Sequence, residues 1–472
     1  MIKAGIAAHK DEEDPPYGYR EVLCDSSHAC NCKGIHCTRD TSVTYGRLRP
    51  LVQFSCLHVP SSCRAGGLVR KGAMMSVVAL AVGCAAAFTP RLPSRIVRHT
   101  RLPVWPAWQG LPLVVLSQLP GPFRGWADRL EDAFGGRVCP MQFNAAEADP
   151  FVLLVHHRHS FRPFDFLRPI FSAVIMPEGF PAHPHRGFET VTYVLPGRAG
   201  LTHRDSEGCK MRYGDGAVQW MTAGRGMLHE EMWDVDAGSD AELYQLWVNL
   251  PPRDKLVPPR VQLLLPEESE TSAGQVQREG TTPVRRSRLL DTTSQSGAVR
   301  VRTLARPRNA RQAAPHPDGV SAQASEQAGA DTYSPITIEH VELNGADASY
   351  TLPLPEGWTC IVYVRRGAIA FGGGGESATM FETAYMARSG GDGLSLTNAH
   401  AGLTDVFVLA GEPIGAPVIA SGTMVMNSQA QVNEALSDFQ SGEFGVPWPH
   451  ELDDAEWEQL CDKRAAARGI GM

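Results

Sequence analysis

The chain has 472 residues, which is enough for about three domains of ordinary size. Its formal net charge is -7, so it has no overall positive field, and direct binding of nucleic acid is not expected. The apolar run that follows Met74 is too short to span a bilayer, and we expect no membrane segment in the mature protein.

Residues 1–73 give little sign of a folded domain. They hold six of the eleven cysteines, among them Cys30, Cys32 and Cys37, with His28 and His36 close by. These residues could bind zinc, but their spacing matches no standard zinc finger, and the segment lacks apolar periodicity. We therefore predict a disordered extension, or upstream sequence that does not belong to the protein. The other cysteines are scattered and are expected to be reduced thiols.

Residues 74–102 have the features of a possible targeting presequence. An apolar run of signal-peptide length ends at the junction 87–90, Ala-Phe-Thr-Pro, and a basic stretch without acidic residues follows it. This order resembles the two-part presequences of algae with secondary plastids. Such a signal works only at an N-terminus, so a plastid location requires translation from Met74 or Met75. The equal alternative is a hydrophobic part of an N-terminal extension, with the protein in the cytoplasm or nucleus.

A connector rich in Pro, Trp and Leu is expected at 103–130, and a first domain at 131–262. Within this domain, 190–195 and 217–221 are rich in β-branched and aromatic residues and adjoin turn signals. Short strands separated by turns predict an all-β domain, either a barrel or a sandwich. A solvated or lid-like loop is expected where three histidines gather, although they could also form a second metal site. These histidines are His156, His157 and His159.

Two short clusters in the first domain carry potential metal ligands two residues apart. His183 and His185 form the first cluster, and His229 and Glu231 form the second. Alternate side chains of a strand lie on one face, so each pair can converge on one point inside a barrel. Glu189 has the same parity as the first pair, and geometry alone does not exclude it as the carboxylate. Three imidazoles and a carboxylate suit Fe(II) or another divalent transition metal, with coordination positions left open.

The second half of the chain has strand-like sequence without these ligands. A polar linker is expected at 263–294, followed by a second domain at 295–445 with a disordered insertion at 306–332. His340 and His400 are its only histidines in strand context and form no His-x-His pair, so we expect a metal-free, structural domain. Apolar residues at helical spacing in 428–440 predict a short C-terminal helix. Residues 446–472 are expected to be a charged tail.

The metal clusters and their surroundings resemble the pirin family. The runs 183–193, 219–231 and 246–251 are similar to the pirin signature, and 355–358, 407–413 and 424–427 are similar to its C-terminal domain. The resemblance implies two tandem cupin barrels, which are double-stranded β-helices, with one iron in the first. It also implies a ligand set and leaves Glu189 as a partner that orients a ligand. By position, the iron ligands are His183, His185, His229 and Glu231.

The resemblance also implies an activity, because some pirins are quercetin 2,3-dioxygenases. We therefore expect an Fe(II) enzyme that uses dioxygen to open the ring of a flavonol-like small molecule. The base that takes the substrate's hydroxyl proton would be Glu231, His203 or Glu189. The candidates for the pocket wall are Gln219, Trp220, Met221 and Arg225.

A different class of function is also open. Some pirins resemble redox-sensing cofactors, in which the oxidation state of the iron alters a surface that docks on a transcription factor. That role requires access to the nucleus, which a plastid presequence would prevent. In either role we expect a monomer.

Overall fold

The structure, a computed structural model, describes residues 89–104, 135–160, 179–234, 240–267, 273–307, 329–372 and 375–469. All of them belong to one compact unit, Val82–Met472, and the other unit, Met1–Ala81, holds none. The predicted extension with its possible zinc ligands lies outside the described residues, as do most of the connector and of the insertion. Among the described helices, none is long and apolar enough to cross a membrane.

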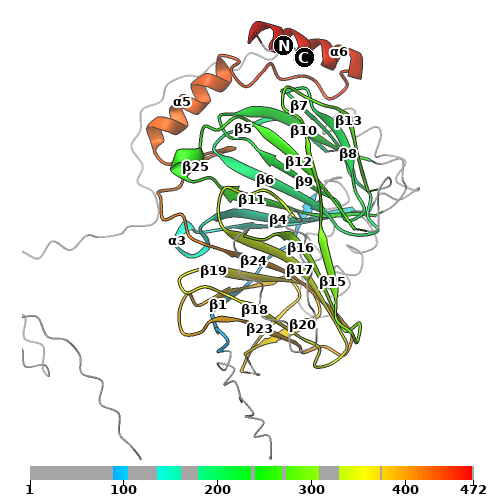
Figure 1. The fold of residues 1–472 in the computed structure, drawn as a ribbon, viewed down its shortest axis with the longest axis vertical. Helices are drawn as coiled ribbons and strands as arrows, with labels where there is room; N and C mark the ends of the chain where they lie inside the picture. Colours follow the sequence, from blue (N-terminus) through cyan, green and yellow to red (C-terminus); the bar gives the residue numbers. More distant parts are fainter. Residues whose placement is uncertain are drawn as a thin grey trace, which may run out of the picture. The chain divides into compact units, whose positions relative to one another are not determined.

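As predicted, the described strands form two tandem barrels (Figure 1). The first barrel combines an eight-stranded sheet, β14-β12-β9-β6-β11-β4-β3-β2, with a five-stranded sheet, β13-β8-β7-β10-β5. Its strands are β2 (Leu102–Val104), β3 (Gly135–Gln142), β4 (Phe151–Ser160), β5 (Gly179–His185), β6 (Phe188–Val194), β7 (Leu201–Asp205), β8 (Lys210–Tyr213), β9 (Val218–Thr222), β10 (Met227–Trp233), β11 (Asp240–Asn249), β12 (Arg260–Leu265), β13 (Gly274–Arg278) and β14 (Arg285–Arg288). The short helices α3 (Ala145–Ala148) and η2 (Pro252–Asp254) lie in its loops.

The second barrel combines a seven-stranded sheet, β1-β22-β19-β24-β17-β16-β15, with a four-stranded sheet, β18-β23-β20-β21. Its strands are β1 (Pro93–Arg98), β15 (Leu290–Thr293), β16 (Val299–Ala305), β17 (Ile336–Asn344), β18 (Ser349–Pro353), β19 (Thr359–Arg366), β20 (Ala368–Phe371), β21 (Glu376–Thr379), β22 (Glu382–Met386), β23 (Gly393–Asn398) and β24 (Leu403–Gly411). A separate hairpin of β25 (Ile419–Ser421) and β26 (Met424–Met426) follows.

The strand β6 separates the interior of the first barrel from the second barrel. Every residue of its sequence Phe-Glu-Thr-Val-Thr-Tyr-Val is buried, because β9 and β11 flank it and both of its faces are covered. Side chains alternate along a strand, so Thr192 lies on one face and Val191 and Tyr193 on the other. Val191 and Tyr193 join an apolar cluster that also contains Phe407 and Leu409 of the second barrel. The two barrels are therefore held together by a shared core.

Polar contacts cross the same interface. The hydroxyl of Tyr193 lies 2.8 Å from Nδ1 of His340, and Nε2 of His340 lies 3.0 Å from Oδ2 of Asp405. Arg365 pairs with Asp405 and, at 3.0 Å, with Glu242 of the first barrel. Buried charges of both signs are thus paired across the junction, as their burial requires.

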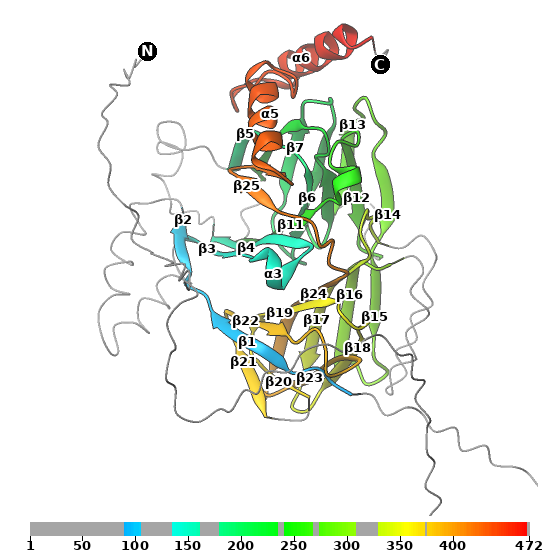
Figure 2. The ribbon, with the colours of Figure 1, turned by 90° about the vertical axis from the view of Figure 1, so that its left-hand side faces the viewer.

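Two helices cover one end of the first barrel (Figure 2). The helix α5 (Gln429–Gln440) confirms the predicted C-terminal helix. The helix α6 (Asp454–Ala467) lies within the predicted charged tail and was not expected from the sequence. Its apolar residues Trp457, Cys461 and Ala465 recur every fourth position, so they share one buried face. The many charged residues on its other faces conceal this stripe in the sequence.

Part of the predicted presequence at 74–102 packs against the second barrel. The strand β1 pairs with β22, and the side chain of Arg91 is buried where it donates hydrogen bonds to the carbonyl oxygens of Leu354 and Trp358. The stretch is basic because β1 is an edge strand with half-exposed arginines, among them Arg95 and Arg98. The presequence and the plastid location stay predictions.

The predicted interdomain linker at 263–294 consists largely of strands. The strands β13 and β14 pair with β8 and β12 of the first barrel, and β15 pairs with β16 of the second. Exposed and partly buried residues alternate in β13, which lies at a sheet edge, as does β14. One face of such strands is exposed to solvent and carries polar residues, and this is why the sequence predicts a linker there.

The predicted loop at His156–His159 is instead the strand β4, which pairs with β3 and β11 along its length. His157 and His159 lie on one face, their ring centroids 5.8 Å apart, and contact Phe180 and Trp233. His156 lies on the other face, against Tyr363 of the second barrel. All three imidazoles are buried, so alternation along the strand rules out a single three-histidine metal site.

Candidate metal centre

Three imidazoles meet inside the first barrel, as the spacing of the histidines predicts. His183 and His185 come from the end of β5, and His229 comes from β10, directly opposite His183 in the antiparallel pair. The ring centroids are 4.5 Å apart for His183 and His229, 4.7 Å for His183 and His185, and 4.9 Å for His185 and His229. Each ring offers a nitrogen, and these nitrogens all lie within 4.8 Å of one another. Such convergence is the geometry of a metal site.

The turn that follows β5 fixes the orientation of the first pair. Gly187 has φ +86, and a Cβ at this position would lie 2.2 Å from the carbonyl oxygen of Val425. Only glycine fits there, for reasons of both conformation and space. The buried ammonium of Lys255 donates hydrogen bonds to the carbonyl oxygens of Gly187 and Val425, at 2.7 Å each. The hairpin of β25 and β26 is thereby tied to the end of the metal-binding strand.

The protonation states of the three imidazoles suit metal binding. Burial, followed by the neighbouring imidazoles, lowers the pKa of His229 well below its usual value, and burial likewise lowers the pKa of His185 and His183. The rings are therefore neutral at pH 7, which is the form that binds metals. Nδ1 of His183 lies 2.7 Å from the carbonyl oxygen of Pro181, which can only accept, so Nδ1 carries the proton and Nε2 the free electron pair.

The burial of His229 supplies a test of whether a metal fits. Both ring nitrogens of His229 are buried and have no hydrogen-bond partner among the described residues. Leaving a buried polar group without a partner costs roughly 1–3 kcal/mol, so native structures rarely do so. A metal ion between the three rings would supply the missing partner. The residues present therefore fit a divalent transition metal.

Glu231 follows His229 on the same face of β10, next to the three histidines. Its Oε1 accepts hydrogen bonds from Thr192 Oγ1, at 2.8 Å, and from the hydroxyl of Tyr213, and its Oε2 accepts one from Gln245 Nε2 at 3.1 Å. The carboxylate stands outside the compact group that the three imidazoles form. Its role as a ligand stays a prediction. Glu230 points the opposite way, as expected, and pairs with Arg204.

Glu189 does not belong to this site, and the prediction that it orients a ligand or acts as a base there is wrong. Its Oε1 accepts a hydrogen bond from Thr222 Oγ1 at 2.6 Å, on the face of β6 that Val191 and Tyr193 share. The parity counted from His185 fails because the chain bends at Gly187 before β6 begins. Phe188, rather than Glu189, contacts His185, with ring centroids 5.1 Å apart.

His203 adjoins the centre, as a catalytic candidate should. Its ring centroid lies 5.5 Å from that of His229, and its Nε2 lies 3.1 Å from Oδ2 of Asp205. Because a carboxylate only accepts, Nε2 carries the proton, and Nδ1 is left with an electron pair. Nδ1 is buried and has no hydrogen-bond partner within the described part of the chain.

The cluster of His203, Asp205 and Cys209 is a structural turn rather than a second centre. Oδ1 of Asp205 accepts hydrogen bonds from the backbone N–H groups of Glu207, at 2.9 Å, and Cys209, at 3.0 Å. Burial raises the pKa of the Cys209 thiol far above its usual range, which disfavours the thiolate that metals prefer. Cys209 is one of four described cysteines, all of them buried free thiols, as predicted.

Several residues around the centre have no strong signal in the sequence. Thr192, Tyr213 and Gln245 hold Glu231, but they come from β6, β8 and β11, and only the pairing of the strands brings them together. Trp247 lies with its ring centroid 5.6 Å from that of His185. Among the predicted wall residues, Trp220 packs in the interface between the barrels, and Arg225 is exposed.

Gln219 is the predicted wall residue that faces the site best. It pairs with Thr192 across β9 and β6, so it shares the face on which Thr192 reaches Glu231. Its amide oxygen and nitrogen are both buried without a partner among the described residues. A buried amide in this state is available to a ligand beside the three imidazoles.

The comparisons with known proteins cover both barrels. Residues 136–248 match the family model described as Pirin, and 340–445 match the one described as Pirin C-terminal cupin domain. A Pseudomonas aeruginosa protein whose provisional name is quercetin 2,3-dioxygenase is 35% identical, over 62% of this chain and 88% of that protein. The pirin of Homo sapiens is 30% identical, over 57% of this chain and 79% of that protein. A crystal structure titled quercetin 2,3-dioxygenase, from Acinetobacter baumannii, has 26% identity and a TM-score of 0.53, and the match covers 76% of this chain and 99% of that one.

Proposed function

The chain belongs to the pirin family, and on that premise we propose that it is an Fe(II)-dependent dioxygenase that opens the ring of flavonol-like substrates. The metal would be held by His183, His185, His229 and Glu231. The observation that carries this proposal is the convergence of three imidazoles inside the first barrel. The names of two similar proteins support the type of reaction.

Three imidazoles and one carboxylate would leave part of the coordination sphere open. When bound, the metal supplies a Lewis acid for the hydroxyl and keto oxygens of a flavonol and a path for electrons to dioxygen. His183 keeps some accessible surface, whereas His185 and His229 are buried. We therefore place the approach of the substrate on the side of His183. The ring of Trp247, beside His185, offers an apolar surface for an aromatic substrate.

The hydroxyl proton of the substrate needs an acceptor near the three histidines. His203 can take it at Nδ1, while the carboxylate of Asp205 at Nε2 stabilises the resulting imidazolium. Glu231 is the second candidate, and its three donors fix the carboxylate in one orientation. The two residues would take the proton at different positions, because Glu231 is a proposed metal ligand and His203 is not.

Anaerobic loading with Fe(II), followed by measurement of oxygen uptake with quercetin, tests the proposal. We expect uptake by the loaded protein, loss of uptake in His229→Ala, and normal uptake in His400→Ala, which changes an exposed histidine of the second barrel. His203→Asn should lower kcat about 100-fold while the variant still binds iron.

A fully iron-loaded protein that consumes no oxygen with quercetin or other flavonols would contradict the enzymatic role. In that case a redox-dependent interaction with a transcription factor would become the better account. Uptake that persists in His229→Ala would instead show that the reaction does not occur at this centre.

A further inference from the structure

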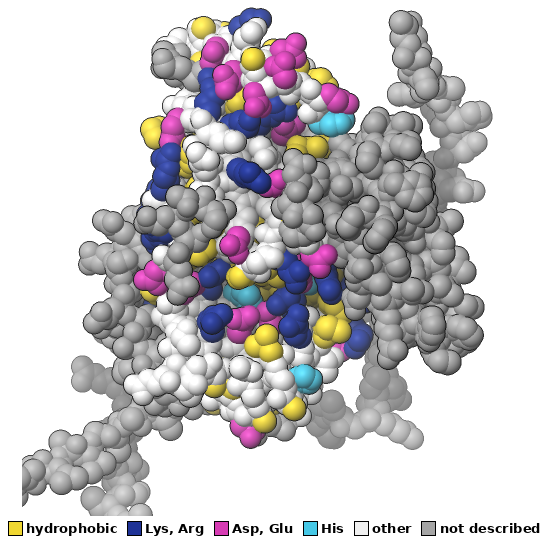
Figure 3. Space-filling model, turned by 90° about the vertical axis from the view of Figure 1, so that its right-hand side faces the viewer, with side chains coloured by type: hydrophobic (Ala, Val, Ile, Leu, Met, Phe, Trp, Pro, Cys, Tyr) yellow, Lys and Arg dark blue, Asp and Glu magenta, His cyan; other side chains and the backbone are white. Residues whose placement is uncertain are grey.

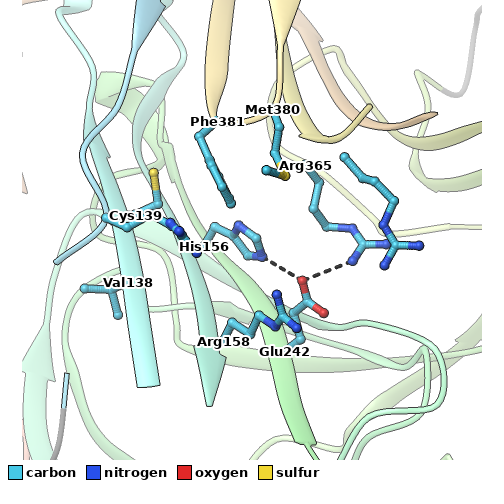
Figure 4. A pocket seen from close by; sticks show the side chains of 10 residues that line it. Val138, Cys139, His156, Arg158, Glu242, Arg365, Met380 and Phe381 are labelled. Atoms are coloured by element: carbon cyan, nitrogen blue, oxygen red, sulfur yellow. Dashed lines mark hydrogen bonds and ion pairs between the residues drawn. The ribbon is translucent and has the colours of Figure 1, made fainter. Parts of the chain in front are cut away.

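A pocket lies between the two barrels (Figure 4). The first barrel supplies one wall from β3, β4 and β11, and the second barrel supplies the other from β19 and the turn before β22. None of the three metal-centre histidines lines it. The lining residues are Arg101, Val138, Cys139, His156, Arg158, Glu242, Arg365, Arg366, Met380 and Phe381.

The charged groups of the pocket wall are mostly guanidinium groups. Four arginines and one carboxylate, that of Glu242, line it. Glu242 is already compensated, since its oxygens lie 3.0 Å from Arg365 Nη1, 3.0 Å from His156 Nε2 and 3.2 Å from Arg198 Nη2. Burial alone would raise the pKa of Glu242, but the hydrogen bond from His156 and the charges of Arg365 and Arg198 lower it to about 2. The lining therefore holds more guanidinium groups than carboxylates, and its one carboxylate already has partners.

An arginine that already has a partner can still donate further hydrogen bonds. Each guanidinium has five N–H groups in a planar fork, so one ion pair uses only part of its capacity. Nε of Arg365 has no hydrogen-bond partner among the described residues, although Arg365 pairs with Glu242 and Asp405. The guanidinium of Arg101 lies 4.4 Å from the ring centroid of Phe381, which holds its charge beside the pocket.

The size of the pocket selects among anions. Its volume is about 60 Å³, room for roughly four to six water molecules. A phosphate or a small carboxylate fits this space, whereas a flavonol does not. Lys and Arg side chains, with Asp and Glu among them, gather on one face of the molecule at the level where the barrels meet (Figure 3).

We propose that this pocket binds a small oxyanion, a phosphate or a short carboxylate, between Arg158 of the first barrel and Arg365 and Arg366 of the second. Bidentate contacts with guanidinium groups would hold it. Because its ligands come from both barrels, the bound anion would hold the barrels together and stabilise the folded protein in proportion to its concentration. The inference is independent of the proposed dioxygenase activity.

The test is calorimetric titration of the metal-loaded, full-length protein in a buffer free of phosphate and carboxylates, with inorganic phosphate in one arm and malonate in the other. Saturable binding of at least one probe, with one site per chain, is expected. The double variant Arg158→Gln/Arg366→Gln should bind that probe at least 10-fold more weakly, since each lost charged hydrogen bond contributes roughly 1.5–3 kcal/mol. The matched control is Arg253→Gln, because the side chain of Arg253 is 82% exposed and does not line the pocket.

The two arms separate the sources of the anion. Phosphate binding without malonate binding identifies a tetrahedral oxyanion, and the reverse identifies a carboxylate; either result supports the site if the double variant loses it. No saturable heat with either probe would overturn the proposal. So would equal affinity in the double variant, with circular dichroism showing that it is folded, or binding that disappears on removal of the metal.

Discussion

The two barrels share a fold and differ in what fills them. The first barrel encloses His183, His185 and His229 beside the hydrogen-bonded carboxylate of Glu231. The interior of the second is mainly an apolar cluster rich in Val and Leu, with Phe371 fully buried in it and Glu339 held there by a hydrogen bond from Tyr350. The same arrangement of strands thus serves as a container for polar groups in one case and as a packed core in the other. The difference lies in the few side chains that face inward.

The histidine of a second-barrel strand shows this difference most clearly. His340 lies on β17, but its ring faces the first barrel, where Tyr193 and Asp405 occupy its nitrogens. Together with Glu342, it forms a group that could hold a metal by distance alone. Asp405 is already bound by His340 and Arg365, and these contacts hold the pKa of its carboxyl far below the usual range. We interpret the group as part of the ion pairs between the barrels.

A cavity in the second barrel should destabilise the protein without affecting the metal. Phe371→Ala removes a fully buried ring, and we expect a loss of about 3–5 kcal/mol in the free energy of unfolding. Urea unfolding measures this loss, and the metal content of the folded variant should equal that of the unchanged protein. A loss of metal from the folded variant would show that the packing of the second barrel also determines metal binding in the first.

The buried carboxyl of Glu189 should make stability depend on pH. Burial raises its pKa from 4.5 to about 7, so the folded protein binds this proton more tightly than the unfolded chain. The resulting contribution is complete below pH 4.5 and is lost as the pH rises through 7. It amounts to something on the order of 3 kcal/mol, at 1.36 kcal/mol for each pKa unit.

Glu189→Gln removes the titrating group and keeps an oxygen that can accept the hydrogen bond from Thr222. Relative to the unchanged protein, this variant should therefore gain stability between pH 5 and pH 8, by up to about 3 kcal/mol. Urea unfolding of both metal-loaded proteins at the two pH values measures the difference. Parallel pH profiles for the two proteins would show that Glu189 does not titrate in this range.

The smallest of these effects concerns the carboxylate beside the histidines. Glu231→Gln should lower the affinity for Fe(II) about 10–100-fold, whether Glu231 binds the metal or only orients its ligands. Glu189→Gln is the matched control, because it changes the same kind of side chain on the other face of β6 and should leave the affinity unchanged. Competition with a chromogenic chelator gives both affinities. An equal loss of Fe(II) affinity in the two variants would show that Glu189 does belong to the site.

The sequence predicts the fold class and the histidines of the metal centre well, for physical reasons that can be named. Alternation along a strand places His183 and His185 on one face, and the glycines on either side of these strands mark their ends. The similarity of the motifs to pirins predicts two barrels, which the strand pairing confirms. Both kinds of signal are local. Residue alternation predicts the face of a side chain correctly as long as the strand is straight.

The errors arise where tertiary structure decides. A bend at Gly187 reverses the face on which Glu189 lies, and no count of residues across it can be reliable. Polar segments such as β13 and β4 look like a linker or a loop because one face is exposed or because buried histidines are polar. The hydrogen bonds that Tyr213 and Gln245 donate to Glu231 depend on which strands are neighbours, and that is a property of the whole barrel.

The central claim is that the first barrel alone binds the metal. The most direct test is the metal content of the purified chain after anaerobic loading with Fe(II) and desalting, measured for the unchanged protein, His229→Ala and His340→Gln. We predict one iron per chain in the unchanged protein and in His340→Gln, and none in His229→Ala. Iron retained by His229→Ala, or lost from a folded His340→Gln, would contradict the account.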